Sequence, residues 1–158
     1  AGDRYGAHMK LNFEVVIDAS IRDVWAAFAD TRNMDRWQQN FLSYTQKSGA
    51  PGQPGSIAEI TYDENGRKVV LTETITERRE DAFLAAGYES SHGSTLIVNR
   101  FEAVDGSTTR WTAWCNFRFR GVMKLMSLFL GGSIRKRTEG DMQRFKLMVE
   151  TDIAGTQT

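Results

Sequence analysis

Between Ile57 and Arg120 the sequence consists mainly of strand-like segments separated by short turns. The segments cover residues 57–62, 67–77, 82–88, 95–104 and 108–120, and Asn65-Gly66 and Asp105-Gly106 are typical of tight hairpin turns. Strands that follow one another through such short connections pair antiparallel, because a parallel pair needs a crossover of a dozen or more residues. This run therefore predicts an antiparallel meander.

The segments on either side of the meander predict one more strand and three helices. Residues 10–18 alternate between apolar and polar side chains, as in a half-buried strand. Ser20 can cap a helix over IRDVWAAFAD, with Asp23 as its capping-box partner, and NMDRWQQN predicts a second short helix. Residues 48–56 read as a loop, and a helical pattern runs from Gly121 to about Glu150. The fold class is α+β, with a sheet of six to seven strands and helices on one face.

Length and composition predict one domain in a reducing compartment. The chain has 158 residues, with 20 basic and 20 acidic side chains, so nothing predicts a general affinity for nucleic acids. Cys115 is the single cysteine and has no disulfide partner in the chain, which favours the cytoplasm. We interpret residues 1–8 as an expression remnant, 9–153 as the domain and 154–158 as a tail.

Several short motifs carry a resemblance to a known superfamily. WAAFAD and NMDRW follow the first strand, and GS at residues 55–56 precedes the strand-like segment 57–62. DGSTTRWTAW forms a late hairpin, and a helix closes the chain. Over residues 10 to about 151 the sequence resembles the START-like (SRPBCC) superfamily, and most of all its polyketide cyclase/dehydrase-like group. The resemblance implies a helix-grip fold, in which a curved antiparallel sheet wraps around the C-terminal helix and encloses a cavity. Members bind lipids, sterols, hormones, quinones or polyketides, and some catalyse cyclisation or dehydration.

Metal and cofactor chemistry find little support in the sequence. His92 is the only histidine after residues 1–8, and Cys115 is the only thiol, so histidine and cysteine cannot form a clustered set of metal ligands. We also expect no cofactor. This composition excludes the iron-dependent ring hydroxylase branch of the superfamily. His92 lies in the polar run SSHGS and reads as a loop histidine rather than a catalytic one.

The phase of the strands predicts which side chains face the helix. Trp111, Cys115 and Phe117 share one face of the last strand, and Glu73 shares a face with Leu71. Glu73 therefore either faces the interior, where it could orient or protonate a ligand, or turns to water at a bulge or sheet edge. If it faces inward, Asn99, Tyr62 or Thr138 could be its companion.

These arguments give a predicted ligand site and two functions. The predicted ligand-binding residues are Trp37, Tyr62, Leu71, Glu73, Phe83, Asn99, Trp111, Cys115, Phe117, Met126, Leu130, Ile134 and Thr138. The chain is either a binding protein for a small hydrophobic or amphipathic ligand, or a polyketide cyclase, aromatase or dehydratase that uses Glu73 and Tyr62 in acid–base catalysis. Trp37 either covers the ligand or fills the core, and Cys115 reads as a small buried apolar group. Arg137 is a candidate contact for an anionic head group.

The segment VMKLMSLFLGG at residues 122–132 is too short to span a membrane, and Lys124 interrupts it. Leu125, Leu128 and Phe129 lie off the apolar stripe of the helix, so they could contact a partner or a membrane surface. Gly131-Gly132 predicts a bend or break there, which would make residues 122–130 a gate over the pocket. A monomer and a homodimer both fit the sequence.

Overall fold

The structure is a computed structural model that describes residues 8–157, except for the side chains of residues 127–129. Its elements, in chain order, are β1 (His8–Ile17), α1 (Ile21–Ala29), the 3-10 turn η1 (Thr31–Asn33), α2 (Met34–Trp37), β2 (Phe41–Ser48), β3 (Ile57–Glu64), β4 (Arg67–Arg79), β5 (Phe83–Ser90), β6 (Gly93–Asp105), β7 (Thr108–Phe119) and α3 (Met123–Thr156).

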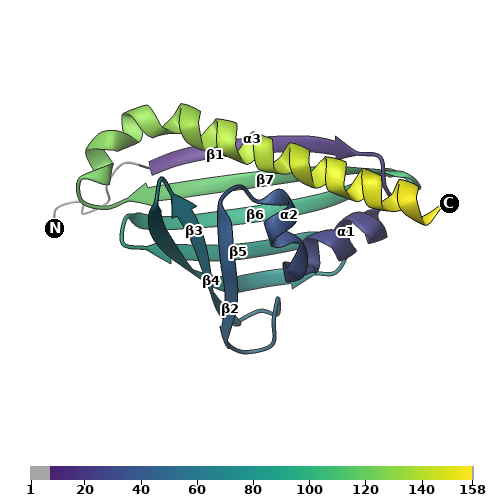
Figure 1. The fold of residues 1–158 in the computed structure, drawn as a ribbon, viewed down its shortest axis with the longest axis horizontal. Helices are drawn as coiled ribbons and strands as arrows, with labels where there is room; N and C mark the ends of the chain where they lie inside the picture. Colours follow the sequence, from purple (N-terminus) through teal and green to yellow (C-terminus); the bar gives the residue numbers. More distant parts are fainter. Residues whose placement is uncertain (1–7, 158) are drawn as a thin grey trace.

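The strands form a seven-stranded antiparallel sheet in the order β1-β7-β6-β5-β4-β3-β2. The predicted meander is confirmed as β3 to β7; β2 extends it by pairing with β3, and β1 joins it by pairing with β7. Figure 1 shows α3 lying across one side of the curved sheet beside β1, with α1 and α2 near its C-terminal half. The predicted α+β helix-grip fold is therefore confirmed, and β2 is a strand that the sequence segments had not named.

Local signals set the boundaries of several elements as the sequence predicted. The Oγ of Ser20 caps α1 by accepting a hydrogen bond from the Asp23 backbone N–H at 3.2 Å. Asn65 and Gly66 both have positive φ angles, 55° and 82°, as a tight hairpin turn of this type requires. The second short helix is shorter than predicted, since only Met34–Trp37 is α-helical.

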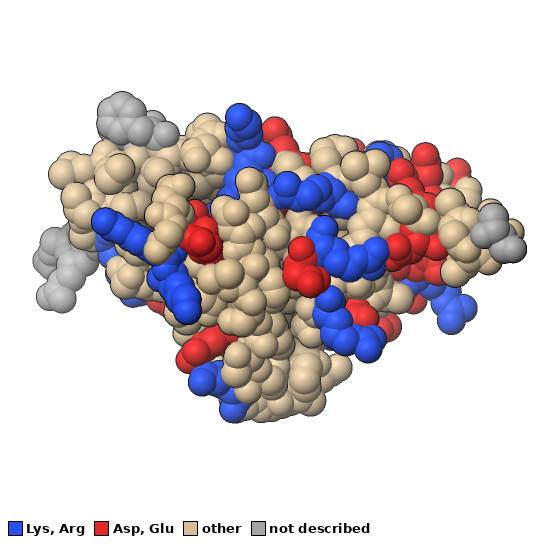
Figure 2. All heavy atoms as spheres, in the orientation of Figure 1, with Lys and Arg blue, Asp and Glu red and all other residues tan. Residues whose placement is uncertain are grey.

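The long helix α3 is continuous from Met123 to Thr156, so of the bend or break predicted at Gly131-Gly132 the break is wrong. Figure 1 does show the helix changing direction within its first turns, in the light green part of the ribbon. Its C-terminal half is tied to α2 by an ion pair of 2.7 Å between Arg36 and Asp152. Figure 2 shows acidic and basic side chains interspersed over the visible face of the molecule.

An aromatic cluster fills the interior where α1, α2 and α3 meet the sheet. Phe145 of α3 has no exposed surface, and its ring centroid lies 5.1 Å from that of Trp111 and 5.3 Å from that of Trp37. The cluster also includes Phe28 and Phe101, whose ring centroids are 4.9 Å apart. These edge-to-face and tilted contacts are of the kind that aromatic rings prefer, and they fix the C-terminal half of α3 to the sheet.

Replacing Phe145 with alanine should lower the free energy of unfolding by about 3–5 kcal/mol, because the change leaves a cavity among fully buried rings. Leu147→Ala on the same helix is the matched control, since Leu147 is 61% exposed and should change stability by less than about 1 kcal/mol. Urea unfolding followed by circular dichroism measures both. Similar losses for the two variants would contradict this description of the core.

Candidate ligand-binding site

The two faces of the sheet differ sharply in their packing. Trp111, Ala113 and Cys115 alternate along β7 and are buried on the side that α3 covers, which we call the inner face. The strand register carries this face across the sheet, because directly paired residues of an antiparallel pair point to the same side. The opposite side, the outer face, carries the residues between them.

Glu73 lies on the inner face, in a row of residues that crosses four strands. It pairs with Tyr88 of β5, which pairs with Thr95 of β6, which pairs with Phe117 of β7. Of the two alternatives that the sequence left open for Glu73, this register gives the inward one. The bulge in β4 comes after Ile75 and so leaves the phase of Glu73 unchanged.

Tyr88 is the companion of Glu73. Its hydroxyl donates a hydrogen bond of 2.7 Å to Oε2 of Glu73. Burial raises the pKa of the Glu73 carboxyl, and the hydrogen bond from Tyr88 offsets only part of this effect. Burial and the nearby charge of Glu73 also raise the pKa of Tyr88, which therefore keeps its proton and acts as a donor. The pair is an acceptor and a donor held together on a largely apolar surface.

Tyr62, the second residue nominated for acid–base chemistry, has a different partner. Its hydroxyl donates to Oε1 of Gln38 at 2.5 Å, and the guanidinium carbon of Arg137 lies 5.4 Å from its ring centroid. Burial raises the pKa of the Tyr62 phenol, against the opposing effect of Arg137. Arg137 itself forms an ion pair with Glu64 and donates to the carbonyl oxygen of Gln39 at 2.9 Å. Its charge is thus already matched within the protein.

Exposure changes along the inner face from one end to the other. Phe101, Trp111 and Ala113 are buried beneath the aromatic cluster. Around the Glu73–Tyr88 pair the same face is only half-buried, at the predicted residues Leu71 and Phe117 and at Ile97. From α3, the predicted residues Leu130, Ile134 and Thr138 are half-buried as well. The end of the inner face near Glu73 therefore keeps accessible surface that is mostly apolar.

Three other predicted residues belong to the filled end of the interior. Trp37 is buried and its ring packs against Phe145 and Trp111, which matches the core alternative for this residue. Asn99 is buried, and its Oδ1 accepts a hydrogen bond of 2.9 Å from the Trp111 indole N–H. It is therefore committed to Trp111 and does not contact Glu73 through this oxygen. Cys115 is buried, and burial raises the pKa of its thiol to about 12, which fits an unreactive group.

Phe83 does not lie where the sequence analysis placed it. It pairs with Arg100 of β6 on the outer face, while Leu84, Ala86 and Tyr88 hold the inner face of β5. The guanidinium carbons of Arg79 and Arg100 lie 4.6 and 4.9 Å from its ring centroid, and these contacts bury the ring. As a wall residue of an internal site, Phe83 is a wrong prediction.

The start of α3 also departs from the prediction. Met126 is 47% exposed and is therefore not part of a packed wall. Leu125 is 76% exposed, as expected for a residue off the apolar stripe. Leu128 and Phe129 lie outside the described side chains, so surface contact through these three residues stays a prediction. In the described part of the chain no helix combines the length and the apolar character needed to cross a membrane.

Two tyrosines of this region were missed by the sequence analysis. Tyr88 is one, and its position in the alternation Leu84, Ala86, Tyr88 was the available signal. Tyr44 of β2 is the other: its pKa is raised by burial and by the charge of Glu73, and its hydroxyl donates to Gln46 at 2.8 Å. No signal in the sequence predicted β2 as a neighbour of this site.

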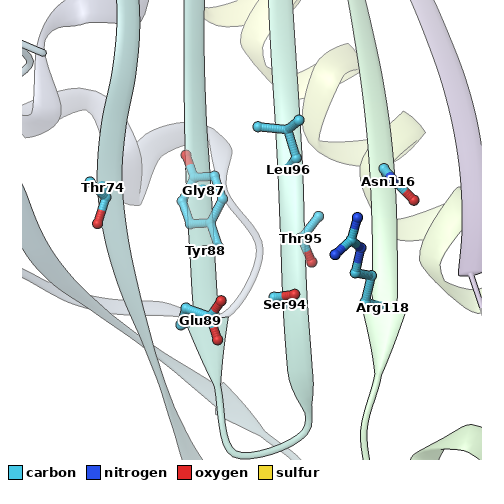
Figure 3. A pocket seen from close by; sticks show the side chains of 9 residues that line it. All are labelled: Thr74, Gly87, Tyr88, Glu89, Ser94, Thr95, Leu96, Asn116 and Arg118. Carbon is cyan, nitrogen blue, oxygen red and sulfur yellow. The ribbon is translucent and has the colours of Figure 1, made fainter. Parts of the chain in front are cut away.

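A hollow of about 320 Å³ lies on the outer face, and Tyr88 and Thr95 of the inner-face row are among the residues that border it. Figure 3 shows its side chains spread over β4 to β7, with Gly87, Leu96 and Asn116 in one row and Glu89, Ser94 and Arg118 in the next. The space beside Gly87 is open, since a Cβ there would meet no atom within 4 Å. It contains none of the predicted ligand-binding residues.

Comparison with known proteins agrees with this architecture. The family model described as polyketide cyclase/dehydrase and lipid transport matches residues 8–149. A comparison with curated protein sequences found no match. Similar solved structures include the Zhui aromatase/cyclase from Streptomyces sp. R1128, with a TM-score of 0.78, 12% identity and coverage of 93% of this chain and 96% of that one.

Two further structures share the fold at low identity. Ara h 8.0201 has a TM-score of 0.74 and 14% identity over 92% of this chain and 99% of its own. A protein from Thermus thermophilus has a TM-score of 0.76 and 13% identity over 91% of this chain and 99% of its own. Since the family model covers nearly the whole sheet and most of α3, the chain belongs to the polyketide cyclase/dehydrase and lipid transport family and has its START-like (SRPBCC) fold.

Proposed function

We propose that the chain binds a small amphipathic molecule on the accessible part of the inner face, between the sheet and α3. The polar end of the ligand contacts Glu73, and its apolar body lies against Leu71, Ile97 and Phe117. The observation that carries this proposal is the Glu73–Tyr88 pair, because it places one oriented polar group on a mostly apolar surface. Small-molecule sites typically combine such a surface with a few polar groups that fix orientation.

The cost of Glu73 to the fold supports a functional use. A partly buried carboxylate without a cationic partner is expensive, and its raised pKa expresses that cost. Among the described residues Glu73 forms no ion pair, so a structural role as one half of a salt bridge does not explain it. Perturbed acids of this kind concentrate at ligand and catalytic sites.

A cyclase, aromatase or dehydratase is the second candidate, and the same pair of side chains favours it. General acid–base catalysis needs two titratable groups within reach of a common point, and Glu73 and Tyr88 meet that condition better than Glu73 and Tyr62. In a dehydration Glu73 would take the proton next to a carbonyl, a carbon–carbon double bond would form, and Tyr88 would protonate the departing hydroxyl. The family description names both cyclases or dehydrases and lipid transport.

A cytoplasmic location is part of the proposal, since the single cysteine has no disulfide partner within the chain. A monomer and a homodimer are equally compatible with a site that lies within one chain.

The neutral aromatic alcohol 2-naphthol is a suitable first probe, because its hydroxyl can donate to Glu73 while its rings contact apolar side chains. Glu73→Gln should weaken binding at pH 7.5 about fivefold to tenfold, since a hydrogen bond to a charged acceptor is stronger than one to an amide. Isothermal titration calorimetry measures the affinity. Glu89→Gln, one residue along β5 but exposed on the outer face, should leave it unchanged. Equal affinities and equal pH dependence for wild type and Glu73→Gln would dispose of the idea.

Glu73 should also make the free energy of unfolding depend on pH. Its pKa in the folded protein lies above the ordinary value of 4.5, so in the window just above pH 4.5 the folded protein holds a proton that the unfolded chain has released. The free energy of unfolding should therefore fall as the pH rises through this window, and fall less in Glu73→Gln. Urea unfolding of both proteins between pH 4.5 and 8 tests this. A difference between the two that does not vary with pH would show that the carboxylate is solvated.

The enzyme candidate can be tested with a β-hydroxyketone that carries a naphthyl group. For a binding protein, we expect mass spectrometry to recover the compound unchanged after incubation. Loss of one water, at a rate reduced at least tenfold in Tyr88→Phe, would instead favour the dehydratase.

A further inference from the structure

The charges around the inner-face site are matched in pairs, with one exception. Arg137 pairs with Glu64, and Arg144 pairs with Asp141 at 2.5 Å. Among the described residues, Glu73 is the acid of this region that has no cationic partner. The titratable or charged groups around Glu73 and its neighbouring tyrosines are Tyr44 of β2, Tyr62 and Glu64 of β3, Tyr88 of β5, Cys115 of β7, and Arg137, Asp141 and Arg144 of α3.

The neutral groups in this set do not offset the charge of Glu73. Burial raises the pKa of Tyr44, Tyr62, Tyr88 and Cys115, so all four keep their protons and stay uncharged near neutral pH. Once Glu73 is ionised, the surroundings of the site therefore carry one net negative charge.

Hydrogen bonding points in the same direction. The hydroxyl of Tyr88 already donates to Oε2 of Glu73, and that of Tyr62 already donates to Gln38. The hydroxyl of Tyr44 is likewise used, by Gln46. Compared with these three tyrosines, Glu73 has acceptor capacity left for a ligand, since a carboxylate accepts several hydrogen bonds and the one from Tyr88 uses only part of this capacity. A ligand that contacts Glu73 must therefore bring a donor.

We propose that the inner-face site selects neutral or cationic amphiphiles that carry a hydrogen-bond donor, such as a phenol, an alcohol or an amine, and rejects carboxylates such as fatty acids. Glu73 is the residue that determines this specificity. The inference rests on the proposed function, since it concerns the same site. Its physical basis is that two like charges in contact at a partly desolvated site repel far more strongly than in water.

Two probes with the same rings and different polar ends test the selectivity. At pH 7.5, where 2-naphthol is neutral and 2-naphthoate is anionic, calorimetry should show 2-naphthol binding at least tenfold more tightly to the wild type. Glu73→Gln should reduce this ratio to about threefold or less, because 2-naphthol loses its charged acceptor while 2-naphthoate is no longer repelled. Glu89→Gln, the outer-face control, should keep the wild-type ratio. If Glu73→Gln does not fold, Glu73→Met, which replaces the carboxylate with an uncharged side chain of similar length, gives the same comparison.

The outcomes separate this inference from the proposed function. A ratio that depends on Glu73 supports both. Binding of 2-naphthoate as tight as that of 2-naphthol overturns the selectivity and leaves the binding function standing. A protein that binds neither probe overturns both.

Discussion

The packing of Phe145 among the aromatic rings of α1, α2 and the sheet determines how the rest of the molecule is arranged. This contact fixes the C-terminal half of α3 over one end of the inner face, where Phe101 and Trp111 are buried. The helix is packed against the sheet there and continues past the other end without an equivalent aromatic contact in the described residues. A single sheet face is thus divided into a filled half and an accessible half.

The accessible half is where the sheet carries its unusual chemistry. A carboxylate placed under the aromatic cluster would lose its hydration entirely, whereas Glu73 keeps partial access to solvent and one donor, Tyr88. At this position burial is sufficient to raise the pKa of Glu73, while partial solvation keeps the free-energy cost of the carboxylate tolerable. In our proposal the same position makes the carboxylate available to a ligand, and its lack of a cationic partner makes it prefer hydrogen-bond donors over acids. On this proposal, the packing of the core determines which part of the inner face is accessible, and the accessible part determines which ligands bind.

Local patterns predicted most of the fold, and non-local pairing decided what they missed. The alternation along β4 is regular up to Ile75, so the sequence placed Glu73 in line with Leu71 but left two alternatives for its side chain, and the register with β5 gives the inward one. In β5 both alternating sets are apolar, and the register with β6 places Phe83 outside and Tyr88 inside. The contact of Tyr88 with Glu73 depends on the register between β4 and β5, which pairs residues 15 positions apart in the chain. Helical periodicity likewise placed Met126 on the apolar stripe, but periodicity does not report where the sheet beneath a helix ends.

The most direct test of the central claim is a crystal structure of the complex with 2-naphthol. The account predicts the probe on the inner face, with its hydroxyl within hydrogen-bond distance of a Glu73 carboxylate oxygen and its rings against Leu71, Ile97 and Phe117. A probe found instead in the outer hollow beside Gly87, or on the exposed start of α3 at Leu125, with the inner face unchanged, would contradict it.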